Sequence, residues 1–188
     1  MTRIIAGAAG SLALTVPDRG TRPTSDRVRE SLFGALEAAD AVTGATVLDL
    51  YAGSGALALE AVSRGAIRAD LVEKAAPAAQ VAERNARVVG RAVPDAAIRV
   101  HRASADAFLA APIAPATGYD LVFLDPPYDV DDAALAATLA LLPPVLAAGA
   151  WVIVERAARS AEPQAPSGLV PLRSRRYGDT TLWWYEAE

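Results

Sequence analysis

The sequence contains no cysteine and a single histidine, His101. Without thiols there is no disulfide framework, no thiolate zinc site and no cysteine nucleophile, and this absence fits a cytoplasmic protein. His101 ends a predicted strand, and the sequence shows no obvious acidic partner for it. Because a catalytic histidine usually needs such a partner, we interpret His101 as a structural residue and expect no metal site.

An uninterrupted hydrophobic run of membrane-spanning length is also missing. Residues 133–154 carry no charge and are long enough to cross a bilayer. However, Pro143-Pro144 and Gly149 divide them into a helix-length piece, a turn and a strand-length piece. At the N-terminus, Gly7 and Gly10 interrupt a mildly apolar stretch where a signal peptide would be most apolar. We therefore expect a cytoplasmic protein without a membrane segment.

The chain has the length of a single domain, and its charges are unevenly distributed. The 188 residues carry a net charge of -4, and 53% of them are hydrophobic. Residues 1–30 hold five arginines against three acidic residues, and residues 156–176 hold five arginines against one. Arginines at both ends of an acidic chain predict a local phosphate-binding face, although scattered solvated arginines would give the same count. Our candidate phosphate contacts are Arg3, Arg19, Arg22, Arg27, Arg29, Arg173 and Arg175.

Strand-like and helix-like patterns alternate from about residue 45 onward. Glycine and proline punctuate them: Gly65 follows the first of these helices, Pro77 lies in the first turn of the next, and Gly90 follows its end. The alternation predicts right-handed crossovers and a parallel sheet that is covered on both faces. The expected strands are 46–51, 68–73, 98–101, 119–124 and 151–155, with helices at 56–64, near 105–110 and around 135–142.

Both ends of the chain depart from this alternation. Residues 169–177 and 180–185 are two strands separated by Gly178-Asp179, a hairpin signature, so they must pair antiparallel. Five parallel strands and this hairpin describe the seven-stranded sheet of the Rossmann-like α/β methyltransferases better than a dinucleotide-binding sheet. At the N-terminus, we expect residues 3–6 and 12–16 to form a separate small hairpin. We divide the chain into an RNA-contacting extension, residues 1–24, and a catalytic domain, residues 25–188.

A glycine turn follows the first strand of the expected sheet, in the segment VLDLYAGSG at residues 47–55. Gly53 and Gly55 allow the backbone to pass close to a ligand, and the start of the next helix offers amide donors. This pattern alone is ambiguous. It also satisfies a relaxed dinucleotide fingerprint, and it is compatible with a tight turn that binds nothing.

Three acidic residues at strand ends favour a nucleoside-containing cofactor. Asp49 could hold the ammonium of a bound amino acid, whereas it would repel a pyrophosphate. Glu73 could accept from both ribose hydroxyls, which serves NAD and S-adenosylmethionine alike. Asp106 could accept from an adenine amino group or, equally well, cap a helix. Together, the three acidic residues favour S-adenosylmethionine as the cofactor but do not exclude NAD.

The most specific feature is the tetrad Asp125-Pro126-Pro127-Tyr128, directly after a predicted strand. Two prolines stiffen the turn and remove two backbone donors. The Asp125 carboxylate and the Pro126 carbonyl could then hold both N–H bonds of a base amine, whose delocalised lone pair makes it a poor nucleophile. Tyr128 offers a face on which the base can stack. The tetrad thus predicts in-line methyl transfer to an exocyclic amine by positioning and electrostatics.

The tetrad resembles that of the amino-methyltransferases of DNA and RNA. The stretch RPTSDRVRESLF at residues 22–33, preceded by RIIAG at residues 3–7, resembles the RsmD family, which methylates guanine N2 in 16S ribosomal RNA. The resemblance covers essentially the whole chain. It implies that S-adenosylmethionine binds at Asp49, Gly53, Gly55, Glu73 and Asp106, and that residues 125–128 hold the amine. It also implies a partner, 16S rRNA or the assembling small ribosomal subunit, and we expect a monomer.

Three other functions remain to be weighed. An NAD-linked dehydrogenase would use the glycine turn but has no need of the tetrad. A DNA adenine-N6 methyltransferase shares the tetrad, although such enzymes usually carry a separate target-recognition domain, for which the chain has no space. An RNA-binding assembly factor could retain the fold without turnover, but it would not need an intact tetrad.

Overall fold

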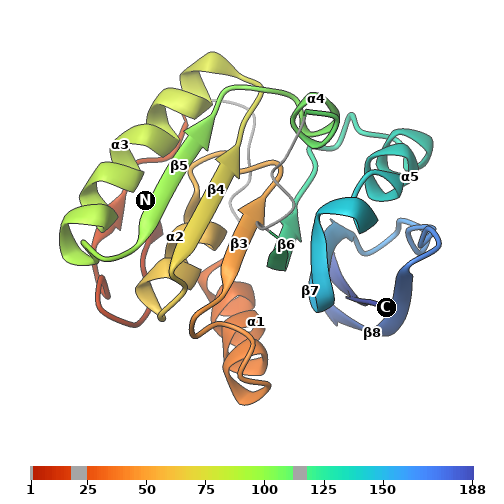
Figure 1. The fold of residues 1–188 in the computed structure, drawn as a ribbon, viewed down its shortest axis with the longest axis horizontal. Helices are drawn as coiled ribbons and strands as arrows, with labels where there is room; N and C mark the ends of the chain where they lie inside the picture. Colours follow the sequence, from red (N-terminus) through yellow and green to blue (C-terminus); the bar gives the residue numbers. More distant parts are fainter. Residues whose placement is uncertain (1, 18–24, 112–117) are drawn as a thin grey trace.

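The computed structural model describes residues 2–17, 25–111 and 118–188 of the chain (Figure 1). Short strands β1 (Thr2–Arg3) and β2 (Ala13–Leu14) precede helix α1 (Asp26–Ala38). The alternating part follows as β3 (Thr46–Asp49), α2 (Ala56–Ser63), β4 (Arg68–Val72), α3 (Ala76–Ala92), β5 (Ala97–His101), α4 (Ala105–Leu109), β6 (Tyr119–Leu124) and α5 (Asp132–Ala140). A 3-10 turn, η1 (Pro143–Val145), leads into β7 (Leu146–Ala157), β8 (Leu169–Tyr177) and β9 (Thr180–Ala187).

The main sheet has seven strands in the order β5-β4-β3-β6-β7-β9-β8. The first five are parallel, and β9 runs antiparallel to both of its neighbours. This arrangement confirms the predicted sheet with its terminal hairpin. The chain runs outward from β3 to one side of the sheet and returns to β6 on the other. In open sheets of this kind, ligands bind in the crevice at the carboxyl ends of the strands, beside such a reversal.

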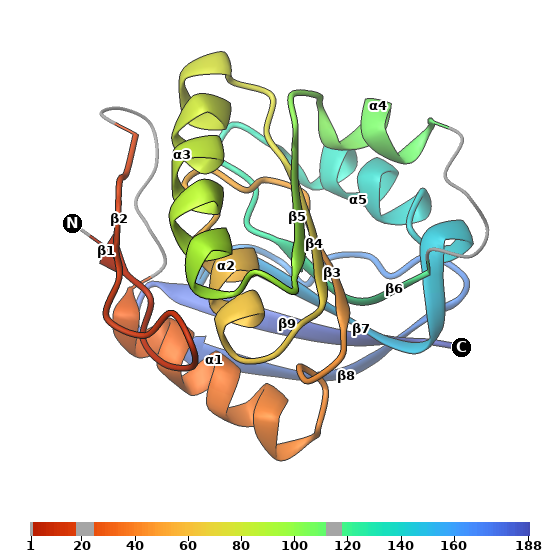
Figure 2. The same ribbon diagram turned by 60° about the vertical axis from the view of Figure 1, so that its left-hand side comes forward.

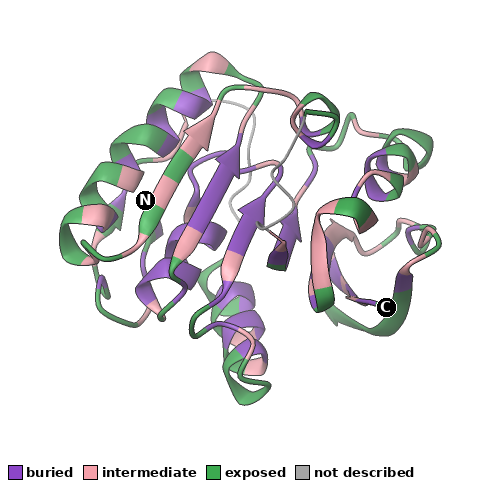
Figure 3. Ribbon diagram, viewed as in Figure 1, coloured by how far each residue is buried: buried purple, intermediate pink, exposed green. Residues whose placement is uncertain are grey.

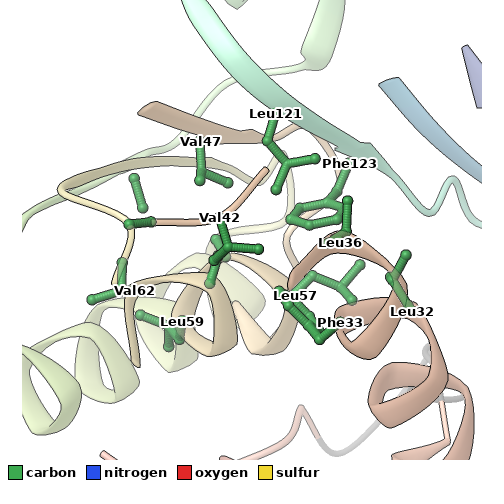
Figure 4. Close-up of a cluster of buried hydrophobic side chains, with 14 of the residues drawn as sticks. Leu32, Phe33, Leu36, Val42, Val47, Leu57, Leu59, Val62, Leu121 and Phe123 are labelled. Carbon is green, nitrogen blue, oxygen red and sulfur yellow. The ribbon is translucent and has the colours of Figure 1, made fainter. Parts of the chain in front are cut away.

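Helices cover both faces of the sheet (Figure 2). Helices α1, α2 and α3 pack on one face, over a core that includes Val47, Leu121 and Phe123 (Figure 4). Helices α4 and α5 pack on the other face, against residues such as Leu48 and Val122. Side chains alternate along each strand and therefore contribute to two separate cores, and most residues of the central strands are buried (Figure 3).

Helix boundaries follow from local chemistry and correct one expectation. Ser25 caps α1, because its side chain accepts from the Val28 amide at 3.3 Å. Gly90 does not follow the end of α3 but lies inside it, since the helix continues to Ala92. It ends there because Pro94 disfavours helical geometry at the residue before it.

The N-terminal hairpin exists, but its strands are two residues long rather than four or five. Backbone contacts to α2 replace the longer ladder. The amides of Ile5 and Ala6 donate to the carboxylate of Glu60, at 2.7 and 3.1 Å. Ile4 and Leu14 are fully buried in the core beneath α1 and α2. Residues 2–17 are thus packed against the sheet's own helices, while the RNA contact predicted for this extension stays a prediction.

Residues 133–154 fold as the sequence suggests, into most of α5, the 3-10 turn and the first part of β7. Among the described residues, no helix combines the length and the apolar character that a membrane crossing requires.

Candidate functional site

A cavity of about 660 Å³ opens at the carboxyl edge of the parallel strands. It reaches from the ends of β3 and β4, past the turn after β6, to the end of β7, and the start of α1 closes one side. Its walls include Tyr51, Glu73, Asp106, all four residues of the tetrad and Glu155. The structure thereby brings two of the three predicted cofactor acids, Glu73 and Asp106, into one space with the predicted amine-binding turn, whereas Asp49, Gly53 and Gly55 are not among the residues that line it.

The glycine turn at the end of β3 depends on left-handed backbone geometry. Gly53 and Gly55 have φ values of +53° and +79°, which residues with a side chain rarely adopt. A Cβ on Gly55 would lie 2.5 Å from Leu71 Cδ2. The first turn of α2 therefore starts directly at Gly55, without a side-chain cap. One amide of this first turn, that of Ala58, donates to the Asp49 carboxylate.

Asp49 lies beneath this turn at the end of β3 and is almost fully buried. Its Oδ2 accepts from the Ala58 amide at 3.4 Å, while Oδ1 has no hydrogen-bond partner among the described residues. Burial raises the pKa of Asp49 to about 7, and the negative charge of Glu73 adds to the rise. An orphaned buried carboxylate oxygen is costly unless a ligand completes it.

Glu73 is held rigidly at the end of β4. One carboxylate oxygen accepts from the Gly53 amide at 3.0 Å and the other from the Ala75 amide at 2.7 Å. These bonds tie the acid to the glycine turn. Since a carboxylate offers about four acceptor positions, Glu73 can still accept from a ligand in the cavity.

Asp106 does not cap α4, because that role belongs to Ser104, whose side chain accepts from the Ala107 amide. Asp106 instead accepts from the Thr138 hydroxyl of α5 at 2.5 Å. Tyr51, whose pKa is raised by burial, lies 3.4 Å from the same hydroxyl. Tyr51 and Thr138 were missed in the sequence because their contact joins distant segments across the sheet edge.

The tetrad forms an exposed turn at the end of β6. Pro126 is buried, whereas Pro127 and Tyr128 are exposed, with 78% of Tyr128 accessible. The Val130 amide donates to the Pro127 carbonyl at 3.0 Å and closes the turn. Tyr128 therefore stands at the mouth of the cavity, where a stacking platform would have to be.

Arg156 of β7 holds this turn in place, a role that the sequence analysis did not predict. Its guanidinium donates to the Val130 carbonyl and to the Asp132 carboxylate, both at 2.9 Å. It thereby joins the turn to the first residue of α5. The sequence counted Arg156 within a basic cluster, but its charge is used inside the protein.

Asn85 of α3 links the N-terminal segment to the glycine turn. It exchanges two hydrogen bonds with the backbone of Thr15 and donates a third, at 2.8 Å, to the Ser54 carbonyl. Asn85 is buried. Its helical spacing with Val81 and Val89 placed it on the core side, and a polar residue there was the available signal of such a bridge.

The candidate RNA-binding arginines divide into three groups. Arg3, Arg27, Arg173 and Arg175 are exposed. The guanidinium of Arg173 lies 4.3 Å from the ring centre of Trp184, and that of Arg175 lies 5.1 Å from the ring centre of Tyr177. Tyr177 also bonds Ser31 of α1 at 2.8 Å, so the end of β8 and α1 form one side of the molecule. Arg19 and Arg22 lie outside the described residues.

Arg29 requires a correction, because it is fully buried. Its Nη2 donates to the Arg3 carbonyl at 2.8 Å and to the Asp26 carboxylate at 2.7 Å. The guanidinium thus fastens the N-terminal hairpin to α1. A buried side chain of this kind is not placed to meet a phosphate, and the sequence could not distinguish it from its exposed neighbour Arg27.

His101 has an acidic partner that the sequence did not reveal. Its Nε2 lies 2.8 Å from Oδ1 of Asp70. The other carboxylate oxygen, Oδ2, accepts from the Arg68 guanidinium and from the Tyr119 hydroxyl. Burial and the charge of Asp70 raise the pKa of Tyr119. None of these four residues lines the cavity, which agrees with a structural role for His101.

Comparison with known proteins places this geometry in a family. The family model described as Conserved hypothetical protein 95 matches residues 2–186. The Ribosomal RNA small subunit methyltransferase D of Escherichia coli (strain K12) is 37% identical over 191 residues, covering 99% of this chain and 90% of that protein. A hypothetical protein of Thermus thermophilus superposes with a TM-score of 0.82 at 32% identity, covering 98% of each chain.

A more distant structure shows the fold alone. The magnesium protoporphyrin IX methyltransferase of Synechocystis PCC 6803, solved with bound SAM, has a TM-score of 0.64 at 15% identity and covers 86% of this chain and 79% of that one. The sheet is therefore that of the S-adenosylmethionine-dependent methyltransferases. With Glu73, Asp106 and the tetrad lining one cavity beside the glycine turn, and with a match over nearly its whole length, the chain belongs to the Conserved hypothetical protein 95 family, the RsmD family that its sequence resembled.

Proposed function

We propose that this protein transfers a methyl group from S-adenosylmethionine to the exocyclic N2 amine of a guanine in 16S ribosomal RNA. The observation that carries the proposal is the single cavity that Glu73, Asp106 and the tetrad line together, next to the glycine turn whose Gly53 amide donates to Glu73. The relatives named as small-subunit rRNA methyltransferases support the choice of substrate.

The residues at one end of the cavity fit the methyl donor. The orphaned, buried Oδ1 of Asp49 is the right partner for an ammonium group, and the fixed carboxylate of Glu73 suits a ribose diol. Asp106 lies farther along the same wall, where an adenine amine could donate to it. When bound there, S-adenosylmethionine supplies a methyl group made electrophilic by its sulfonium.

The tetrad at the other end handles the nucleophile. Asp125 accepts one N–H bond of the guanine amine, and the Pro126 carbonyl accepts the other, which drives the nitrogen towards tetrahedral geometry. The nitrogen lone pair then bonds to the methyl carbon as the bond from that carbon to sulfur breaks, and the amine afterwards loses one proton to solvent. Tyr128 stacks on the base, and Arg156 holds the turn in place through its hydrogen bond to the Val130 carbonyl.

The exposed arginines provide the remaining contact with RNA. Arg27 lies at the start of α1, which closes one side of the cavity. The two exposed arginines of β8, Arg173 and Arg175, lie on the same side of the molecule. We assign phosphate contacts to these three and to Arg3, and we retain Arg19 and Arg22 as candidates. The partner is then 16S rRNA or the assembling small subunit, and the protein acts as a cytoplasmic monomer with residues 1–24 as its RNA-contacting extension.

Methyl transfer to defined substrates tests this function. Purified protein and labelled S-adenosylmethionine are incubated with small ribosomal subunits from a strain lacking the modification, and in parallel with duplex DNA. We expect N2-methylguanosine in the rRNA and no label in the DNA. N6-methyladenine in DNA, with unlabelled rRNA, would identify a DNA adenine methyltransferase instead.

A further inference from the structure

Glu155, at the end of β7, lines the same cavity as the tetrad and has no part in the function described so far. Strands β6 and β7 are parallel, and their last registered pair is Leu124 with Val154. The residues that follow this pair are Asp125, directly after the end of β6, and Glu155, within the last part of β7. Neighbouring strands lie about 4.8 Å apart, so the sheet edge sets two carboxylate residues side by side.

The alternation of side chains indicates which way Glu155 faces. Val154 belongs to the core beneath α4 and α5, whereas Ile153 belongs to the core beneath α1. Glu155 therefore shares the α1 face with Ile153. The start of α1, at Ser25 and Val28, walls the cavity on that same face.

The edge of guanine that carries the reactive amine matches a pair of acceptors. Guanine presents two adjacent donor groups, the N2 amine and N1–H, beside the O6 acceptor. Adenine presents its amine beside N1, which is an acceptor and carries no proton. A second carboxylate beside the amine-binding turn would thus accept from guanine and repel adenine. Specificity of this kind combines an attractive contact with a repulsive one.

We propose that Glu155 determines the choice of base by accepting a hydrogen bond from guanine N1–H while Asp125 holds the N2 amine. The inference rests on the proposed function, because it assigns to Glu155 the recognition of the same guanine base. A carboxylate offers about four acceptor positions, so the assignment holds whatever other groups Glu155 binds. Glu155 is then a specificity-determining residue, and it explains how the tetrad serves guanine rather than adenine in this chain.

The test compares two bases that carry the same amine. Small subunits are reconstituted with 16S rRNA containing either guanine or 2-aminopurine at the methylated position; 2-aminopurine keeps the exocyclic 2-amine but lacks the proton on N1. We expect the wild-type protein to methylate guanine roughly 10- to 100-fold faster, the discrimination typical of one good polar base contact. The Glu155→Gln variant can donate to the bare N1, so its preference for guanine should shrink by about tenfold or more.

Matched variants separate recognition from charge and folding. Asp129→Asn removes a charge from the same cavity wall and should keep the wild-type preference, while Glu155→Asp should keep the preference at a lower rate. Equal rates on the two bases for the wild-type protein, or an unchanged preference in Glu155→Gln, would overturn the inference. Because the preference is a ratio within one preparation, partial misfolding does not alter it. Failure of the wild-type protein to methylate guanine would instead contradict the proposed function itself.

Discussion

The two ends of the cavity are built differently. The cofactor end is made of buried or tightly held groups, since Asp49 is 1% exposed and Glu73 is bonded to two backbone amides. The base end is open, and Tyr128 is 78% exposed. A small donor can be enclosed by groups that are already in place, whereas a base attached to a large RNA must enter from outside. Under the proposed function, the difference implies that donor binding is preorganised in the free protein and that RNA completes part of the base site.

A large expected effect on cofactor binding tests the rigidity of the cofactor end. Gly55→Ala forces a side chain into left-handed geometry and against Leu71. Strain of about 2–3 kcal/mol should weaken S-adenosylmethionine binding by roughly 100-fold, measured by titration calorimetry. The control is Gly34→Ala, an exposed helical position with nothing near its Cβ, which should stabilise the protein by about 0.4–1 kcal/mol. Equal cofactor affinities in both variants would show that the turn is not part of the donor site.

A smaller effect tests the open end. Tyr128→Ala removes an exposed ring that no core contact needs, so the thermal stability should hardly change. Loss of one stacking contact is worth about 1–3 kcal/mol, so methylation of limiting small subunits should slow by roughly 10- to 100-fold. Tyr128→Phe is the matched control and should retain the wild-type rate. If Tyr128→Ala instead weakened cofactor binding, the division of the cavity into two ends would be wrong.

Asp49 gives the cofactor end a dependence on pH. Its folded pKa of about 7 lies above the usual 3.8, so the folded protein holds the extra proton and loses stability as pH rises between these values. An ammonium group at Oδ1 would favour the ionised form, so binding should release a proton below pH 7. We expect the affinity for S-adenosylmethionine to rise about tenfold from pH 6 to pH 8.

Asp49→Asn supplies the control for this pH dependence. The ligand's own amine titrates equally against both proteins, so the difference between their profiles isolates Asp49. Parallel profiles for the variant and the wild-type protein would remove Asp49 from the role of ammonium acceptor.

The smallest expected effect concerns the two exposed arginines of β8. Substituting both Arg173 and Arg175 with alanine should lower the slope of RNA affinity against salt by about two units, one for each phosphate contact. Cofactor affinity should stay at the wild-type value. Arg87→Ala, on the exposed side of α3, is the matched surface control and should leave the slope unaltered. Identical slopes for the double variant and the wild-type protein would place the RNA elsewhere.

The sequence predicted the parts of this site that lie in short, contiguous motifs. The glycine turn and the tetrad directly follow strands, and parallel strands place their carboxyl ends at one edge, so proximity followed from the fold class. The alternation of strands and helices also predicted the five parallel strands and the terminal hairpin, although the order of the strands came from the structure. One local signal was misinterpreted, because α3 continues through Gly90 and ends only before Pro94.

Side chains that act across the sheet could not be predicted. Arg29, Arg156 and Asn85 each bind backbone carbonyls from segments far away in sequence. A count of charges cannot separate a buried arginine such as Arg29 from an exposed one such as Arg27. The partner of His101 was hidden for the same reason, because Asp70 lies on the neighbouring strand.

The most direct test of the account uses a single variant, Asp125→Ala, with two readouts. Methyl transfer to small ribosomal subunits should fall by on the order of 100- to 1,000-fold, because one of the two acceptors that hold the amine is gone. The affinity for S-adenosylmethionine, measured by calorimetry on the same preparation, should stay at the wild-type value. Undiminished formation of N2-methylguanosine by Asp125→Ala would contradict the assignment of the tetrad as the catalytic turn.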